Sequence, residues 1–141
     1  MTAFLTNEAL HQKSPEQITA LLYEAALTNL EEALAHNERK EFIEANEKLK
    51  KAGDIVYRLG AGLNYEAGIV ADQLDQVYNY IADKIIEANY KKDNEIIREV
   101  IQIVESIMSA WNEAMKVKKD PQSSLVKQKA QAYESTSMYE S

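Results

Sequence analysis

Residues 42–63 read FIEANEKLKKAGDIVYRLGAGL, and this stretch decides the fold. Its apolar residues recur in alternating steps of three and four, the pattern of a long helix packed near-antiparallel against its neighbours. These residues are Phe42, Ala45, Leu49, Ala52, Val56, Leu59 and Leu63. We therefore predict a helix over about residues 39–64, which ends in the glycine-rich corner LGAGLNYEAG.

Three further stretches have the same helical period. Upstream, Ser14-Pro15-Glu16-Gln17 offers a capping hydroxyl, a proline at the first helical position and a side chain able to reach back, so it predicts a helix over 15–36. Downstream, apolar stripes predict one helix over about 68–90 and another that Asp93 or Asn94 caps and that continues to Met115. The last stripe is the widest, so we expect this helix to be the most buried.

The composition agrees with an all-α protein. The chain holds only 4 Gly and 2 Pro in 141 residues, whereas an all-β domain needs many turn residues. Short connections make consecutive helices antiparallel, so we predict an antiparallel four-helix bundle. We expect a short N-terminal arm over residues 1–13, the bundle over 14–116, and a flexible or weakly helical C-terminal tail over 117–141, where the apolar pattern fails.

Charge and residue usage exclude several classes of function. Lys+Arg number 16 and Asp+Glu 23, a net charge of -7 that disfavours nucleic acid and anionic lipid as partners. The chain has no Cys, which excludes disulfides and thiolate metal sites and suits a reducing cytoplasm. The first residues lack the pattern of a signal peptide, and no apolar run approaches about 18 residues. We therefore expect a cytoplasmic protein that does not insert into a membrane.

The side chains that enzymes use are not grouped in the sequence. His11 and His36 lie before and at the far end of the first predicted helix, about 30 Å apart by helical rise, so they cannot share a metal ion. Asp72 and Asp75 lie off their apolar stripe and read as solvated carboxylates. A ferritin-like bundle enzyme would need inward carboxylates with histidines. We expect no catalytic residue, no metal and no cofactor.

The tyrosines divide into two groups. Tyr23 and Tyr78 lie on or near the core stripes, where each hydroxyl needs a partner or must reach solvent. Other tyrosines lie away from the stripes and suit either the rim of the bundle or an interface with another protein, namely Tyr57, Tyr65, Tyr80 and Tyr90.

Four segments follow one another along residues 12–116: SPEQITALLYEAAL, the LNYEAG corner, ADQLDQVYNYIADKIIEAN and SAWNEAM. In this order and spacing they resemble the flagellar export chaperone FliS family. The resemblance implies a cytoplasmic four-helix chaperone that binds the C-terminal segment of newly made flagellin in an apolar groove. It also implies that the chaperone prevents premature polymerisation and delivers flagellin to the flagellar export apparatus, without a nucleotide or metal.

We expect the groove along the two long seams that flank the corner. The candidates for flagellin binding are Ile55, Leu59, Leu63, Leu74, Tyr78, Ile81 and Ile85. A stripe by itself does not separate groove from core, so an ordinary core role stays open for each. The family usually has a longer, tyrosine-bearing N-terminal arm that covers the free groove and helps in docking to the export machinery. Here Phe4, Leu5 and Leu10 are the candidates for such a plug or docking element.

One alternative function fits the helices equally well, a helical adaptor or secretion chaperone for a different protein client, because the client follows from the resemblance alone. The oligomeric state, monomer or dimer, also stays open.

Overall fold

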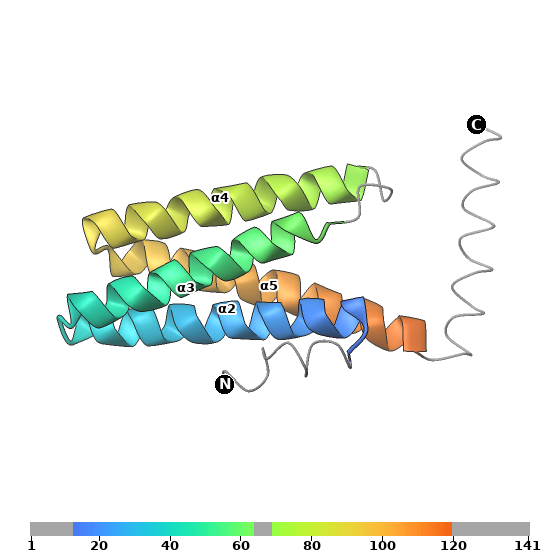
Figure 1. The fold of residues 1–141 in the computed structure, drawn as a ribbon, viewed down its shortest axis with the longest axis horizontal. Helices are drawn as coiled ribbons and strands as arrows, with labels where there is room; N and C mark the ends of the chain where they lie inside the picture. The colour runs from blue at the N-terminus through green and yellow to red at the C-terminus, as the bar shows by residue number, and fades with distance from the viewer. Residues whose placement is uncertain (1–12, 64–68, 120–141) are drawn as a thin grey trace. The chain divides into compact units, whose positions relative to one another are not determined.

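The computed structural model describes residues 13–63 and 69–119, and every regular element in these residues is an α-helix (Figure 1). The four helices are α2 (Pro15–Glu38), α3 (Phe42–Ala61), α4 (Ile69–Lys91) and α5 (Asn94–Lys119). The predicted all-α class with four helices is confirmed. The helices begin or end up to four residues from the predicted bounds, and α5 extends three residues past the expected end of the bundle at residue 116.

The predicted start signals form as expected. The Ser14 hydroxyl accepts a hydrogen bond from the Gln17 backbone N–H at 3.2 Å, and the Gln17 side-chain oxygen accepts one from the Ser14 N–H at 2.9 Å. Of the two candidate caps of α5, Asp93 is the one used, because its carboxylate accepts a hydrogen bond from the Glu95 N–H at 2.9 Å. Each contact satisfies a backbone N–H that has no partner inside its helix.

The two short turns between helices use lysine in the left-handed conformation. Lys40 has φ 60° and Lys92 has φ 54°. In the first turn the Glu41 N–H donates to the His36 carbonyl at 2.8 Å, and in the second the Asp93 N–H donates to the Ala88 carbonyl at 3.2 Å. These bonds are typical of the Schellman motif, in which glycine usually occupies the left-handed position. Lysine therefore strains both turns, since its Cβ crowds the backbone there.

Small residues bring α2 and α3 together. These two helices approach each other most closely, and α3 is next closest to α4. Four alanines, Ala26 and Ala33 on α2 and Ala45 and Ala52 on α3, are at most 1% exposed. Short side chains at buried positions allow two helix backbones to approach, so the alanines explain the closeness of this pair.

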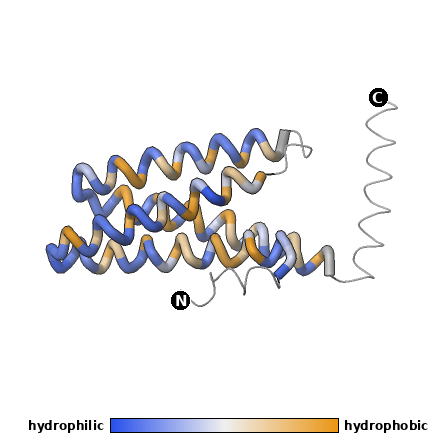
Figure 2. The backbone as a smooth tube through the Cα atoms, in the orientation of Figure 1, coloured by the Kyte–Doolittle hydropathy of each residue, from blue (hydrophilic) through white to orange (hydrophobic). Residues whose placement is uncertain are grey.

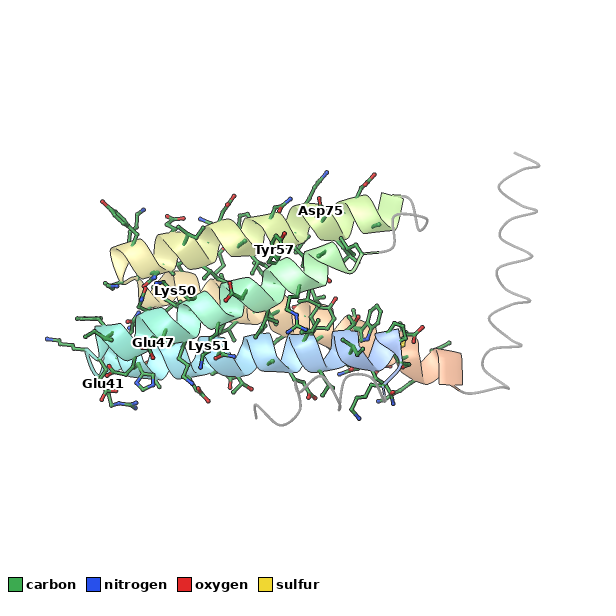
Figure 3. The ribbon with its side chains drawn as sticks, in the orientation of Figure 1. Glu41, Glu47, Lys50, Lys51, Tyr57 and Asp75 are labelled. Atoms are coloured by element: carbon green, nitrogen blue, oxygen red, sulfur yellow. The ribbon has the colours of Figure 1, made fainter. Side chains whose placement is uncertain are left out.

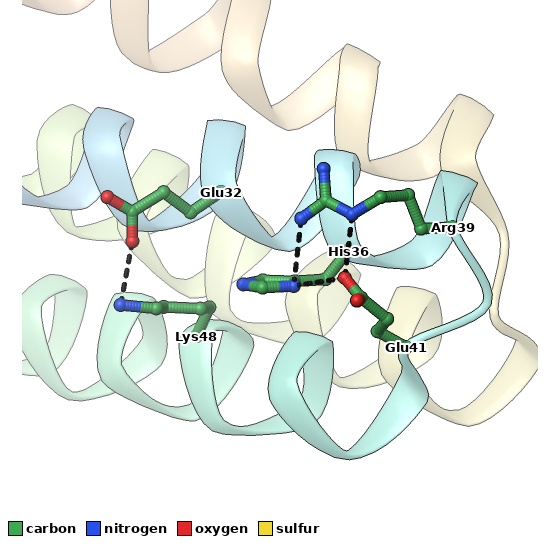
Figure 4. Close-up of polar contacts among 5 residues, drawn as sticks. All are labelled: Glu32, His36, Arg39, Glu41 and Lys48. Carbon is green, nitrogen blue, oxygen red and sulfur yellow. Dashed lines mark hydrogen bonds and ion pairs between the residues drawn. The ribbon is translucent and has the colours of Figure 1, made fainter.

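Polar contacts also join the helices. The Lys48 ammonium lies 2.7 Å from the Glu32 carboxylate between α3 and α2, and Glu41 contacts His36 and Arg39 at the turn (Figure 4). The Tyr80 hydroxyl on α4 donates to Glu99 on α5 at 2.5 Å.

The beginning of α5 also meets α2, because Arg98 lies 3.4 Å from Glu38. The first turns of α5 therefore lie beside both α4 and α2, which closes the four-helix arrangement.

Hydrophobic positions recur along each helix and supply the core (Figure 2). The prediction that the fourth helix is the most buried is wrong. In α5 four described side chains are buried, Ile97, Val100, Ile101 and Val104, whereas α2 buries seven along its length. The cause is the amphipathic character of α5, which turns one face inward and leaves its other faces to solvent.

The chain divides into two compact units, residues 1–108 and 109–141. Helices α2, α3, α4 and the first turns of α5 belong to the first unit, which holds all the features described below. Within the described residues, no helix combines the length and apolar character needed to cross a membrane.

Candidate functional site

The seam between α3 and α4 is built from small and polar residues. At one end the Asn89 side-chain amide donates a hydrogen bond to the Asn46 side-chain oxygen. Farther along, a Cβ placed on Gly53 would lie 4.0 Å from the Ile85 side chain. Asn46, Gly53 and Gly60 are seven residues apart, so they follow one face of α3, and this face looks toward α4.

Large apolar side chains flank this seam on its solvent side. They are Ile43 and Tyr57 of α3, 75% and 77% exposed, and Ile86 and Tyr90 of α4, 68% and 88% exposed. Ile43 and Ile86 stand three residues before the hydrogen-bonded asparagines, and residues three apart on a helix are neighbours. We call these four residues the α3/α4 strip. Exposed large apolar side chains gathered on one face are typical of surfaces that bind another protein.

A hollow of about 280 Å³ lies between the same two helices, at the end that leads to residues 64–68. Helix α3 lines it with Val56, Tyr57, Gly60 and Ala61. Helix α4 lines it with Asp75, Tyr78, Asn79 and Ala82. Tyr57 belongs to both the strip and the hollow, and we call the two together the α3/α4 groove, although the exposed charged residues Glu47, Lys50 and Asp54 lie on α3 between Ile43 and Tyr57.

The side chains singled out from the sequence are mostly buried and, apart from one, do not line the groove. Five of the seven are buried: Ile55, Leu59, Tyr78, Ile81 and Ile85. Leu63 and Leu74 are half-buried. Only Tyr78 among the seven also lines the hollow. The arm residues Phe4, Leu5 and Leu10 lie outside the described residues.

The helical period favoured the buried positions because it identifies the side of a helix that faces inward. It gave no indication of Ile43 and Ile86, which lie off the stripes. An isolated aliphatic residue on the polar side of each of two adjacent helices is the signal that could have found them.

A pair of tyrosines forms part of the core next to the hollow. The hydroxyl oxygens of Tyr23 on α2 and Tyr78 on α4 lie 2.5 Å apart and share a hydrogen bond, so the expectation that these hydroxyls find partners is confirmed. Burial raises the pKa of both phenols, and at Tyr23 the hydrogen bond with Tyr78 raises the pKa further. Both side chains are therefore neutral at physiological pH and serve as hydrogen-bonding core residues.

Metal-ligating side chains do not gather in the part of the chain that the structure describes. In residues 13–63 and 69–119 no three His, Asp or Glu side chains are placed to hold one ion. His36 instead contacts Glu41 at 2.9 Å, and Arg39 contacts the same carboxylate at 2.7 Å. Both contacts hold the pKa of Glu41 below its usual value, which keeps this carboxylate charged at the turn.

Comparison with known proteins gives a consistent result along most of the chain. A sequence model of the family described as flagellar protein FliS matches residues 3–118. The flagellar secretion chaperone FliS of Vibrio cholerae is 33% identical over 105 residues, which cover 74% of this chain and 77% of the relative. The proteins of the same name from Salmonella typhimurium and Bacillus subtilis are 31% and 28% identical, over 74% and 81% of this chain and 79% and 84% of theirs.

The fold is similar to that of a solved structure, a crystal structure of a flagellar chaperone from bacteria. The two chains superpose with a TM-score of 0.69 over 82% of this chain and 94% of the other. Their sequences are 17% identical, so this likeness concerns the fold, and it supports the four-helix arrangement described above.

Proposed function

This chain belongs to the flagellar secretion chaperone FliS family, and from that premise we propose that it binds the C-terminal segment of flagellin in the α3/α4 groove. In this proposal the protein works in the cytoplasm, where it covers apolar surface of flagellin that would otherwise polymerise early. It then delivers flagellin to the flagellar export apparatus. The work is binding alone, with no catalytic step and no cofactor.

The observation that carries the proposal is the exposure of the α3/α4 strip. Ile43 and Tyr57 stand fourteen residues apart on α3, about 21 Å by helical rise. That length suits three to four turns of an amphipathic helix lying in the groove, with its apolar side on the strip. Exposing the two isoleucines to water is unfavourable in the free protein. A partner helix that covers them removes this apolar surface from water and so gains binding free energy.

Binding of this kind would order a flexible segment on a preformed surface. The segment loses conformational entropy as it becomes helical, and burial of its apolar side chains in the groove offsets that loss. A negative heat-capacity change is the expected signature, because apolar surface leaves water.

We also propose a role for the N-terminal arm, whose residues Phe4, Leu5 and Leu10 would cover the free groove or dock on the export machinery. If the arm covers the groove, deletion of residues 1–12 removes a competitor and tightens flagellin binding. Unchanged or weaker affinity of the deletion variant would count against the covering role.

Isothermal titration with the C-terminal segment of flagellin from the same organism tests the proposed client. We expect roughly one-to-one binding to the full chain with a negative heat-capacity change. The double variant Ile43→Ser and Ile86→Ser removes two large apolar contacts, each worth about 1.5 kcal/mol or more when buried, so we expect a loss of affinity of at least about tenfold.

Tyr80→Ser is the matched control, since Tyr80 is an exposed aromatic residue of α4 that faces Glu99 on α5 instead of α3. It should leave the affinity unchanged, and thermal unfolding should show that all variants fold. Absence of binding would reject flagellin as the client and favour a secretion chaperone or adaptor for a different protein. Equal losses in both variants would place the binding site away from the groove.

A further inference from the structure

The hollow at the end of the α3/α4 groove combines two kinds of surface. Part of its lining consists of small apolar side chains, among them Val56, Ala61 and Ala82. Asp75 and Asn79 add a carboxylate and an amide from successive turns of α4, and Tyr57 adds an exposed aromatic ring from α3. Figure 3 shows Tyr57 and Asp75 on neighbouring stretches of the two helices.

The Asp75 carboxylate is available to a ligand. It is half-buried, and among the described residues no hydrogen bond or ion pair engages its side chain. Opposite it stands Gly60, where an added Cβ would lie 4.0 Å from an Asp75 oxygen, at ordinary contact distance. The space beside the carboxylate is therefore open because α3 presents a glycine at this point.

The local charge favours a cation. Among the described residues that line the hollow, Asp75 is the one charged side chain. Arg58, on the same stretch of α3, is exposed and does not line the hollow. A positively charged group entering beside Asp75 thus meets a negative potential that no lining residue of the hollow offsets.

The size of the hollow limits the ligand. About 280 Å³ lies below the range of pockets that hold a drug-sized molecule, and it suits a single long side chain. A side chain with an apolar stem and a cationic tip matches both surfaces, because its stem can lie along the alanines while its tip reaches the carboxylate.

From these features we infer that the hollow receives an arginine side chain from the segment bound in the groove, an inference that rests on the proposed function. The guanidinium donates to the Asp75 carboxylate and to the side-chain oxygen of Asn79, and its flat face stacks on the Tyr57 ring. Arginine fits better than lysine, because a planar fork of donors can serve two neighbouring acceptors and stack on an aromatic ring at once. The hollow then fixes the register of the partner helix along the strip.

A small probe tests the hollow independently of flagellin. N-acetyl-arginine amide is titrated into the isotope-labelled full chain while backbone amide resonances are followed by NMR. N-acetyl-citrulline amide, its neutral isostere, serves as the comparison. We expect saturable shifts centred on Tyr57, Gly60 and Asn79 with the arginine probe, and at least fivefold weaker binding with citrulline. Equal binding of the two probes, or shifts spread over the whole surface, would overturn the inference.

Variants then test whether the charge of Asp75 is responsible for binding the arginine probe. Asp75→Asn keeps the shape of the side chain and removes its charge, so it should weaken the arginine probe at least fivefold. Asp83→Asn is the matched control, because Asp83 is an exposed carboxylate of α4 about 12 Å farther along the helix and outside the hollow. Equal effects of both variants would mean that the probe senses only the overall charge of the protein.

The flagellin segment supplies the last test. Each of its arginines is replaced in turn by glutamine, and every peptide is titrated against the natural chain and Asp75→Asn. Replacing one particular arginine should weaken binding to the natural chain about tenfold. The same replacement should not weaken binding to Asp75→Asn further, as expected for two side chains that contact each other directly. If the segment binds tightly but no arginine couples to Asp75, this inference fails while the proposed function stands. If the segment does not bind at all, the proposed function fails and the probe still decides what the hollow takes.

Discussion

The hydroxyls of Tyr23 and Tyr78 meet in the core, 2.5 Å apart, and join α2 to α4 in an interior whose other buried side chains are apolar except for Asn37. Each phenol gives the other a polar partner at a position that is at most 4% exposed. Burial of an aromatic ring adds stability, and the shared hydrogen bond removes the cost of burying its polar end. The pair therefore also fixes which faces of α2 and α4 turn inward.

Removal of one hydroxyl should cost about 1 kcal/mol of unfolding free energy, the usual net contribution of a buried hydrogen bond. We expect Tyr23→Phe and Tyr78→Phe each to lower stability by this amount in guanidinium denaturation. The double variant should lose less than the sum of the two, because the second change removes a hydroxyl whose shared bond is already gone. Additive losses would show that the two hydroxyls act independently.

The raised pKa values of the pair predict destabilisation in alkali. Both phenols have a pKa above the ordinary value of 10.0 in the folded chain, whereas in the unfolded chain they ionise near that value. Below pH 10 both states bind the proton equally, so the pair adds no pH dependence. As the pH rises above about 10 the unfolded state alone loses protons, and the folded state loses stability relative to it.

Melting temperatures measured from pH 8 to pH 11 check this prediction. They should fall more steeply above pH 10 in the natural chain than in the Tyr23→Phe, Tyr78→Phe double variant, which lacks both phenols. The remaining tyrosines and the lysines are common to both proteins, so the difference between the curves isolates the pair. Parallel curves would contradict the assignment.

The strained lysines of the two turns can be relieved. Lys40→Gly should raise the unfolding free energy by about 1 kcal/mol, because glycine adopts positive φ without a Cβ clash. Lys92→Gly should gain less, since the Lys92 ammonium donates to Asn89 at 3.3 Å and lies 5.9 Å from the centre of the Phe42 ring. Chemical denaturation measures both. Lys40→Ala keeps the Cβ and should give no comparable gain; an equal gain would reject strain as the cause.

Glycines inside α3 offer a second route to stability. Gly53 lies in the helix interior, and an added Cβ would make an ordinary contact with Ile85 at 4.0 Å. Gly53→Ala should therefore raise the unfolding free energy by about 0.5–1 kcal/mol through better helix propensity. Gly60→Ala should gain similarly and also narrow the hollow, so it should weaken the arginine probe where Gly53→Ala does not. A lower melting temperature for Gly53→Ala would show that the seam has no room for a methyl group.

The helices were predictable because their signals are local. The capping box at Ser14 and the apolar period of residues 42–63 act within a few residues, and the structure has both. The family resemblance was also correct. The left-handed lysines had no such signal, because lysine does not favour a positive φ. The short turn between two packed helices imposes this conformation. Tertiary contacts determined these positions.

The candidate site was predictable in part. The sequence predicted a groove along α3 and α4, the pair for which we also propose it, but favoured inward residues such as Ile81, because a periodic stripe reports burial. Ile43 and Ile86 become neighbours of one seam only when the register of α3 against α4 is known, and the Asn46–Asn89 contact sets that register. The hollow depended on Gly60 facing Asp75, a juxtaposition that no single helix encodes.

The brevity of the two turns bears on how the chain folds. Three residues separate α2 from α3 and two separate α4 from α5, so most pairings join segments close in sequence. Helical domains with such low contact order fold in microseconds to milliseconds, whereas ribosomes add about 5–20 residues per second. The alanine-lined pair of α2 and α3 can therefore assemble while later residues are still being synthesised, so one side of the groove is in place before α4 arrives to complete it.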